Sequence, residues 1–491
     1  MHSSLEKEHI RLTNILIIGH TIGSRRWEKE LLVRLSAAGH VVSSCRGPTP
    51  APIARGLDVV LAIESRRFGP SLASRSESLP SGGSGPADLV IDLTGTAARR
   101  DTPVLTLEFC GHSTFPAGVA EMLASGRLPE LAVRLDGVTV ARGRPMLSDR
   151  LWLSRSCNDL LAGAISLVAQ SVASFSAGEL VPIADSPAPL LRNGGFVRHY
   201  LPFFCRGLVD RAVQKLRLGR RPFYWQVAYR LIDGPGVAET GQLDGTPFTV
   251  LPDDGQRFYA DPFVLERDGR HYLFVEEFPY ATGRGVISVA ELADDGNFGV
   301  PRVVLEEAHH LSYPQVFAHA GEIFMIPESA AARELVLYRA AQFPDRWVRD
   351  TVLMTDKDFN DATLLESNGR FWLLGTERFG FGSASDTMAV YSAPSLRGPW
   401  VAHGLNPIAV DHSAARPGGA FIRQDDALVL PVQNGSRAYG GGLGLMRLDR
   451  LDELDVRFAP PRPIGPGPAW ARVGIHTLNR AGNVEVVDSA G

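Results

Sequence analysis

The side chains best suited to chemistry in this sequence stand near the starts of strand-like runs in its C-terminal half. They are Asp261, His310, Tyr313, Asp361, Arg416 and His476. Two carboxylates facing each other across a solvated pocket suit glycosyl chemistry, since one can act on water or the anomeric carbon while the other stabilises a cationic transition state. Two Asp residues alone are a weak signal, because structural Asp residues are also common at strand starts.

A second set of polar residues ends the runs that follow, 15 to 17 residues after these starts: Glu277, Glu328, Glu377 and Gln433. Two interpretations stay open. The four ends line a functional site together with the residues at the starts, or each bonds the amides of loops beside its own strand.

The spacing of these residues reveals a repeat. Asp261, Tyr313, Asp361 and Gly474 each lie eight residues before a glycine in a turn between two strand-like runs, and RPGGAFIRQDDALVLPVQ supplies a further unit. The units start about 48 to 60 residues apart, the length of a four-stranded blade, and the five of them predict an all-β five-bladed propeller over 222–491. The run PFYWQVAYRL, just before the first unit, is expected to complete the last blade. The first strand of each blade would then bring its polar residues to one end of the central channel.

The N-terminal part has a different pattern. Short β-branched runs alternate with helical segments over 10–175, which predicts an open, largely parallel α/β sheet of Rossmann-like type. The turn GHTIG lacks the glycine spacing of a dinucleotide site. The apolar run LLAGAISLVAQSVASF, 160–175, is too short for a membrane span and predicts a buried helix.

Residues 176–221 form the predicted linker between the two domains. Its second half, from 196, places seven Arg or Lys against one Asp with apolar residues between them. Such a basic amphipathic helix suits peripheral contact with a membrane surface, although a solvated helix packed between domains gives the same pattern.

The composition narrows the class of protein. A chain of 491 residues with a formal net charge of −4 and a pI near 6.4 has no global field to gather nucleic acid, so no nucleic-acid partner is expected. Four scattered cysteines and the absence of a metal motif predict free thiols, no cofactor and no metal. The polar first residues lack a secretory signal, so a cytoplasmic location is predicted.

The motif YADPFV, with five such units, resembles the five-bladed glycoside hydrolases of the arabinanase, β-xylosidase and invertase clan. The resemblance implies a general base or nucleophile at Asp261 and a second carboxylate at Asp361. That clan takes its general acid, a Glu, from the start of the fourth blade, where HSAARPGGAF has no carboxylate. Ordinary glycoside hydrolysis is therefore not expected, whereas transfer from a phosphate leaving group needs no strong acid.

A closer resemblance, over 223–488, is to the propeller of plant glucosamine inositolphosphorylceramide transferases and their bacterial relatives. The stretches FYADPF, LSYPQVF, IPE, DATL, ARP and GIHTLN carry it. In the bacterial relatives this propeller follows a formyltransferase-like domain, which 10–175 is expected to resemble. The Asn-x-His motif of formyltransferases is absent, and only His112, Glu108 and Asp136 stand where substitutes would be needed.

Together these features predict a carbohydrate-active protein of glycosyl-transferase type, or a diverged glycoside hydrolase, acting on a sugar, glycolipid or sugar phosphate. Asp261 would be the base or nucleophile and Asp361 the stabiliser, while Arg416 and His476 would bind an anionic or hydroxyl group of the substrate. Two alternatives stay open: a non-catalytic glycan-binding propeller, and a formyltransferase acting on an amino sugar.

Overall fold

The computed structural model describes residues 12–47, 54–80, 82, 86–95, 101–185, 196–218, 224–380, 382–437, 439–470 and 475–490. Parts of the predicted linker (186–195 and 219–221) and Gly474 of the repeat lie outside the described residues. Contacts divide the chain into two compact units, 1–212 and 213–491, except that the short segments 380–383 and 404–410 group with the first.

The first unit is built on a mixed sheet with the strand order β2-β1-β3-β4-β5-β6. Its strands are β1 (Asn14–Gly19), β2 (Val41–Arg46), β3 (Leu89–Asp92), β4 (Val104–Phe109), β5 (Leu131–Leu135) and β6 (Val138–Gly143). The first four are parallel, and β5 and β6 add an antiparallel edge. The prediction of a largely parallel α/β sheet is confirmed at this level.

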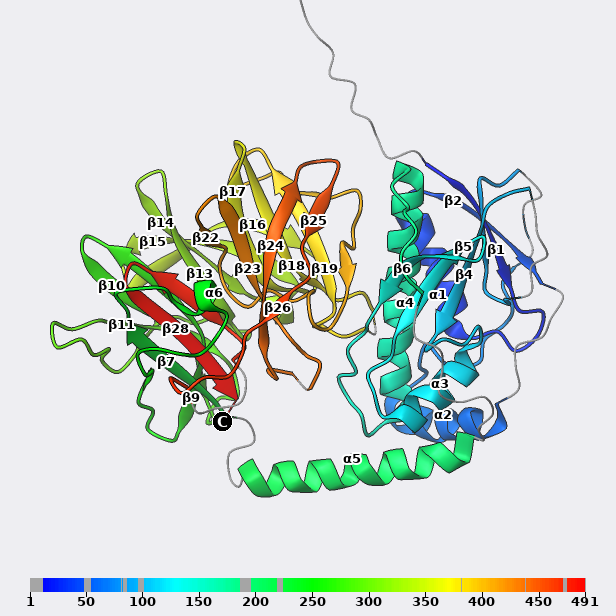
Figure 1. The fold of residues 1–491 in the computed structure, drawn as a ribbon, viewed down its shortest axis with the longest axis horizontal. Helices are drawn as coiled ribbons and strands as arrows, with labels where there is room; N and C mark the ends of the chain where they lie inside the picture. Colours follow the sequence, from blue (N-terminus) through cyan, green and yellow to red (C-terminus); the bar gives the residue numbers. More distant parts are fainter. Residues whose placement is uncertain are drawn as a thin grey trace, which may run out of the picture. The chain divides into compact units, whose positions relative to one another are not determined.

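Among the described residues, four helices accompany this sheet: α1 (Arg26–Ala37), α2 (Arg55–Phe68), α3 (Phe115–Ser125) and α4 (Leu153–Ala177). A further helix, α5 (Phe196–Leu218), begins in this unit and ends in the second. Helix α4 is long and apolar enough to cross a membrane by length and composition, but 61% of its most apolar window is buried. It packs against β5, β6, α1 and α2 (Figure 1). The buried helix predicted for 160–175 is therefore the core helix of this unit.

The second unit consists of five antiparallel sheets, which confirms the predicted five-bladed propeller. Blade 1 holds β9 (Arg257–Arg267), β10 (Arg270–Pro279), β11 (Val286–Glu291) and β12 (Arg302–Leu305). Blade 2 holds β13 (Ser312–His319), β14 (Glu322–Glu328), β15 (Glu334–Gln342) and β16 (Arg346–Thr355), with the short helix η1 (Ala330–Ala332). Blade 3 holds β17 (Phe359–Ser367), β18 (Arg370–Glu377), β19 (Thr387–Ala393) and β20 (Val401–Ala402); β21 (Ala409–Val410) follows. Blade 4 holds β22 (Ile422–Gln424), β23 (Ala427–Gln433), β24 (Leu443–Leu451), β25 (Val456–Phe458) and β26 (Arg462–Pro463).

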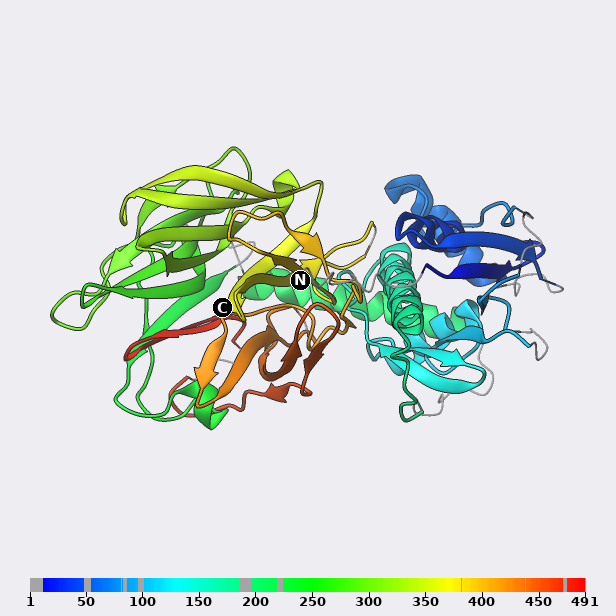
Figure 2. The same cartoon turned by 90° about the horizontal axis from the view of Figure 1, so that it is seen from above.

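The last blade joins the two ends of the propeller sequence. It combines β27 (Leu478–Ala481) and β28 (Val484–Ala490) with β7 (Trp225–Leu231) and β8 (Thr249–Val250), and α6 (Val237–Thr240) lies between β7 and β8. Strand β28 pairs with β7 over its whole length. In Figure 2 the colours run around the ring from green through yellow and orange to red, and red meets green in this blade. The described part of the run PFYWQVAYRL, 224–231, thus completes the last blade, as expected.

A repeated bulge shapes the innermost strands of blades 1 to 3. The pairing of β9 with β10 shifts register beside Asp261, and the same shift occurs beside Tyr313 in β13 and Asp361 in β17. These three residues have φ of 48°, 45° and 51°, in the left-handed region that costs a residue with a Cβ atom about 1 kcal/mol or more. A bulge re-aims the side chain it carries, so the shared spacing found in the sequence corresponds to a shared backbone distortion.

Candidate functional site

Tyr313 ties its own blade to three others. Its backbone N–H donates to Asp261 Oδ2 at 3.2 Å. Its hydroxyl lies 2.9 Å from Thr363 Oγ1 and accepts a hydrogen bond from Gly419 N at 2.7 Å. The ring is fully buried, and burial raises the pKa of the phenol well above its usual value. Tyr313 therefore braces the axis as a neutral hydrogen-bonding group.

Asp261 faces residues of the last blade across the point where the ring closes. Its carboxylate accepts a hydrogen bond from Thr477 Oγ1 at 3.2 Å, and one oxygen lies 3.6 Å from His476 Nε2. His476 Nδ1 lies 2.9 Å from Asp488 Oδ2, and the same Asp488 oxygen accepts the backbone N–H of Asp261 at 2.9 Å. Asp488 therefore orients both the imidazole and the bulged backbone that presents Asp261.

These contacts set opposite charges on neighbouring groups. Burial raises the pKa of Asp261 to about 6, and the charge of His476 limits that rise. Burial lowers the pKa of His476, but Asp488 and Asp261 outweigh it and raise the pKa to about 9. The His476 ring also stacks on Trp225 of β7, with centroids 4.3 Å apart. The pair suits a base that titrates near neutrality beside an imidazolium.

Asp361 is held by blades 3 and 4. It accepts hydrogen bonds from Arg416 Nε at 2.6 Å, Arg416 Nη2 at 3.1 Å and Gln433 Nε2 at 2.6 Å. A carboxylate with a bidentate guanidinium and an amide donor is a fixed negative charge. The remaining Arg416 nitrogen donates to the Ala384 carbonyl at 2.9 Å. Arg416 is thus placed as the counter-charge of Asp361 more than as an open anion binder.

Two further carboxyl groups reach this cluster from second strands. Glu328 Oε2 accepts the backbone N–H of Asp361 at 3.3 Å and lies 3.6 Å from Arg416 Nη2. Burial, and then the charge of Asp361, raise the pKa of Glu328 well above its usual value. Glu276 is also buried, and burial with the charge of Asp261 raises its pKa well above normal. Burial thus favours the protonated form of both groups relative to an exposed carboxyl group.

Strand register explains why Glu276 belongs to the cluster while Glu277 does not. Glu276 pairs with Ala260, the residue before Asp261, just as Glu328 pairs with Ser312, the residue before Tyr313. Counting along the sequence instead aligns Glu277 with Glu328, and a slip of one residue moves a side chain to the opposite face of a strand. Glu277 bonds Arg257 and Ser288 Oγ, the latter at 2.6 Å.

The other predicted residues lie at the edge of the cluster or outside it. In blade 3 Thr376 takes the position opposite the residue before Asp361, so Glu377 is turned away. Glu377 accepts hydrogen bonds from Lys357 Nζ at 2.7 Å and Tyr391 Oη at 2.6 Å. His310 is one-third exposed and lies 3.4 Å from Glu276 Oε1, where burial lowers the pKa of its ring.

One group in this cluster has the spacing of a cation site. Among the described residues, Asp261, His476 and Asp488 offer ligand atoms within 4.8 Å of one another. The raised pKa of His476 favours an imidazole protonated on both nitrogens, and such a ring has no lone pair for a metal. A cation at this position would have to displace that proton, because a metal-bound imidazole nitrogen must be deprotonated.

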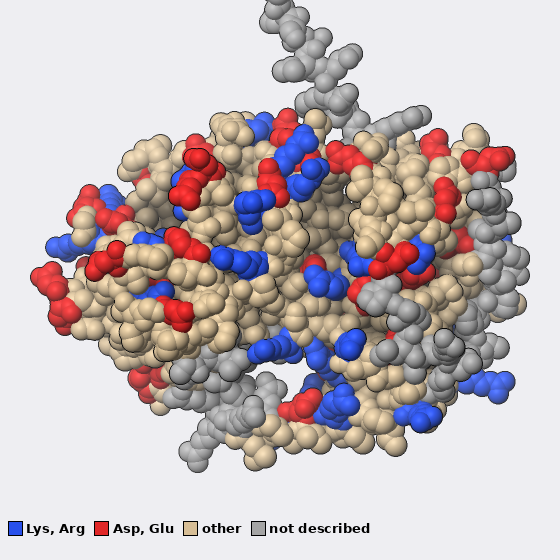
Figure 3. Space-filling view, in the orientation of Figure 1, with Lys and Arg blue, Asp and Glu red and all other residues tan. Residues whose placement is uncertain are grey.

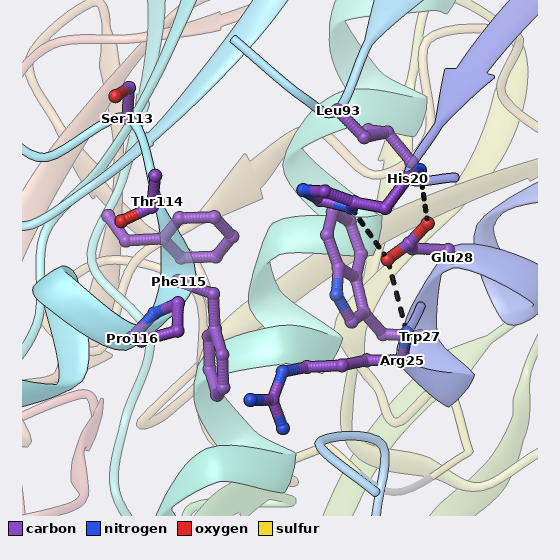
Figure 4. Close-up of a pocket in the computed structure, with 10 residues that line it drawn as sticks. His20, Arg25, Trp27, Glu28, Leu93, Ser113, Thr114, Phe115 and Pro116 are labelled. Atoms are coloured by element: carbon purple, nitrogen blue, oxygen red, sulfur yellow. Dashed lines mark hydrogen bonds and ion pairs between the residues drawn. The ribbon is translucent and has the colours of Figure 1, made fainter. Parts of the chain in front are cut away.

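The first unit carries its own small pocket, where the parallel strands β1, β3 and β4 end (Figure 4). Its cavity volume is about 20 Å³, room for about one water molecule. His20 points toward Glu28, with Nδ1 3.1 Å from Oε1, and Trp27 and Phe115 form apolar walls. Ligands of open α/β sheets bind at this edge, so the pocket is a second candidate site.

The residues considered as formyltransferase substitutes have other partners. His112 Nε2 lies 3.4 Å from Glu121 Oε2, and Glu108 Oε1 lies 2.9 Å from Arg134 Nε. Asp136, in the turn before β6, accepts the backbone N–H of Val104 at 3.0 Å. The pocket residues His20 and Glu28 were missed in the sequence, because only the fold shows that the end of β1 faces the first turn of α1.

Comparison with known proteins bears on the propeller. Residues 252–479 match the family model described as glucosamine inositolphosphorylceramide transferase 1, N-terminal. The rice protein named glucosamine inositolphosphorylceramide transferase 1 (Oryza sativa subsp. japonica) is 35% identical over 208 residues, which cover 41% of this chain and 28% of that protein. Its Arabidopsis thaliana counterpart is 34% identical over 204 residues, 41% of this chain and 26% of that one. The chain thus matches less than a third of these relatives' length.

Solved structures of low similarity also match. An exo-β-1,3-galactanase from Clostridium thermocellum gives a TM-score of 0.36 at 11% identity, covering 48% of this chain and 59% of its own. A β-1,2-mannobiose phosphorylase from Listeria innocua gives 0.37 at 13% identity, covering 49% and 92%. The fold assignment rests on the sheet order itself. The formyltransferase likeness of 10–175 stays a prediction, whereas the resemblance of segment 252–479 to the N-terminal module of the glucosamine inositolphosphorylceramide transferase family is confirmed.

Proposed function

We propose that this protein transfers a glycosyl group to a lipid-linked or phosphorylated acceptor at the propeller axis. The observation that carries the proposal is the convergence of Asp261, beside the imidazolium of His476, with Asp361, fixed by Arg416. Glu276 and Glu328 add protonated carboxyl groups to the same cluster. Enzymes that make and break glycosidic bonds need this division of carboxyl groups between base, charge stabiliser and acid.

Each group then has a role in one displacement step. Asp261 accepts the proton of the acceptor hydroxyl while the hydroxyl oxygen forms a bond to the anomeric carbon of the donor sugar. The bond from that carbon to the leaving oxygen breaks, and the fixed charge of Asp361 stabilises the cationic character that develops. The leaving oxygen takes a proton from Glu328, or departs as a phosphate without one. The missing fourth-blade Glu thus has replacements on the second strands.

The relatives support the choice of reaction and substrate class. The names of the matching plant proteins describe transfer to an inositolphosphorylceramide, a glycolipid precursor. A sugar, glycolipid or sugar phosphate is the substrate class proposed for this chain, and the predicted cytoplasmic location belongs to the proposal. Peripheral membrane contact through 196–221 is developed below.

The test compares two Asp→Asn variants that share a backbone conformation. Asp261 and Asp268 both have a left-handed φ, 48° and 52°, which Asn also adopts readily, but Asp268 lies exposed in the hairpin turn. Purified proteins are incubated with a panel of nucleotide sugars and extracted lipid acceptors, and products are identified by mass spectrometry. Asp261→Asn should lower turnover by about a thousandfold, as loss of a base costs 10²–10⁴, and Asp268→Asn should not.

Two outcomes would count against transfer at the axis. If Asp261→Asn turns over as well as the parent, the reaction lies elsewhere. If neither protein turns over any donor but both bind glycans with equal affinity, the propeller is a binding module.

A second candidate function is formyl transfer to an amino sugar in the first unit, favoured by the pocket at the ends of β1, β3 and β4. A 10-formyl-tetrahydrofolate analogue should then raise the melting temperature of the first unit. His20→Gln, inside the pocket, should abolish this rise, whereas His112→Gln, paired with Glu121 outside it, should not. No stabilisation by the analogue would remove this candidate.

A further inference from the structure

Helix α5 has two faces of different character, and only one is covered. On the covered face, Phe196, Tyr200 and Phe204 stack along the helix with ring centroids 5.5 and 6.0 Å apart. Phe204 also meets Trp152, at the start of α4, at 6.3 Å. Spacings of four residues place these rings on one side of a helix, so this aromatic row seats α5 on the first unit.

The adjoining face exposes large aliphatic side chains. Val197 is 68% exposed, Leu201 62%, Leu208 47% and Val209 60%. At 100° per residue these positions fall within about a third of the helix circumference, and Leu216, 83% exposed, continues the row. A row of this kind along a helix of 23 residues is unusual on a protein surface in water.

Positive charge accompanies this exposed row. The described side chains of 196–216 include four cations, Arg198, Arg206, Arg211 and Lys215, against the single carboxylate of Asp210. All four cations are exposed, and Arg211 keeps a 3.2 Å contact with Asp149. Figure 3 shows blue side chains bordering the tan surface of α5 at the bottom of the view. At 100° per residue Arg198 and Lys215 fall within the row, and Arg206 and Arg211 lie on its two sides. The surface thus mixes aliphatic and basic side chains.

We propose that the exposed face of α5 docks on the surface of an anionic lipid bilayer, with the helix lying in the membrane plane. The aliphatic row would enter the boundary between headgroups and acyl chains, while Arg and Lys would contact lipid phosphates. A partner protein of neutral charge would not need the four cations, and one with an acidic groove would not need so long an aliphatic row. The docking is independent of which reaction the propeller performs.

The test is vesicle flotation of the full chain. Vesicles of phosphatidylcholine alone and of phosphatidylcholine with phosphatidylglycerol are mixed with the parent protein and the double variant Leu201→Asp/Leu208→Asp. Both side chains are exposed, so the variant should fold as the parent does. We expect the parent to float with anionic vesicles only, less so at high salt, and the variant to bind at least about tenfold more weakly.

A matched control places the same change elsewhere. Val300 and Val303 are 75% and 49% exposed in the propeller, so Val300→Asp/Val303→Asp adds the same charge without touching α5 and should float like the parent. Cys205 is exposed on the same face, and a polarity-sensitive fluorescent dye can be attached to it in a Cys45→Ser background. The emission of this dye should shift to shorter wavelength when anionic vesicles are added.

Three results would overturn the proposal. The parent protein fails to float with anionic vesicles at low salt, or the α5 double variant floats as the parent does. In the third, light scattering shows a dimer that the double variant dissociates, so that the face joins two copies of the chain. None of these results touches the Asp261 test, so failure of docking and failure of the proposed reaction are distinguishable.

Discussion

Replacing Arg416 with methionine tests whether this side chain is the counter-charge of Asp361. Methionine keeps much of the volume and removes the guanidinium, which leaves the buried Asp361 with Gln433 as its remaining donor. Removing one partner of a buried pair typically costs about 3–5 kcal/mol, because the other charge stays desolvated. At about 2–4 °C per kcal/mol for a unit of this size, the melting temperature of the propeller should fall by about 10 °C.

The assay is a double-mutant cycle followed by scanning calorimetry. Asp361→Asn alone leaves Arg416 near Glu328, 3.6 Å away, and should cost less than Arg416→Met. The double variant removes both charges and should recover about 2 kcal/mol or more relative to the sum of the single losses. If the losses add within about 0.5 kcal/mol, or if Arg416→Met melts as the parent does, the two residues are not coupled. Arg416 would then be free to bind an anionic substrate.

Three further predictions follow from the same cluster. If Asp261 is the base, turnover should rise with pH around an apparent pKa of about 6, since the ionised form accepts the proton, and a flat profile from pH 5 to 7 would remove it from that role. In the folded state the pKa of His476 is raised from its ordinary value of 6.5 to about 9, which stabilises the folded protein by about 3 kcal/mol. This stabilisation is fully present below pH 6.5 and is lost as pH rises through 9. The melting temperature should therefore fall more steeply over this range in the parent than in Asp488→Asn, which lacks the main charge that raises the pKa; parallel curves would contradict the assignment. Adding a chelator should change the melting temperature by less than about 1 °C, because no bound cation is expected to stabilise the folded state. A larger fall would show that a cation occupies the position between Asp261 and Asp488.

The repeat made the propeller predictable, because side chains at equal distances from a turn occupy equal places in successive blades. Asp261, Tyr313 and Asp361 occupy equivalent places in their blades, as their spacing indicates, and β7 completes the last blade, as its place before the first unit indicates. The bulge itself, however, inserts a residue into one strand and not into its partner. Counting across it assigned Glu277 to a position that Glu276 fills.

Partners between blades could not be predicted from local pattern. Arg416 meets Asp361 across 55 residues, and His476 meets Asp261 across more than two hundred. Their type suggested a role toward substrate, but the close approach of the inner strands gives them carboxylate partners within the protein. Asp488 was missed for a different reason: it lies only 12 residues from His476, on the paired strand of the same blade, and its role depends on hydrogen bonds to that ring and to the backbone of Asp261.

Closure of the ring by β7 has a consequence for when the site comes into being. Strand β7 leaves the ribosome long before β27 and β28. The edge of β7 that pairs with β28 therefore stays unpaired while the other four blades are synthesised. Asp261 likewise has no His476 or Asp488 beside it until the last residues of the propeller emerge. Such pairing of distant segments is slow to form and exposes an unpaired strand meanwhile. A chain that stops short of β28 would therefore carry a folded first unit and an unassembled site, open to proteases and chaperones but unable to act on a substrate.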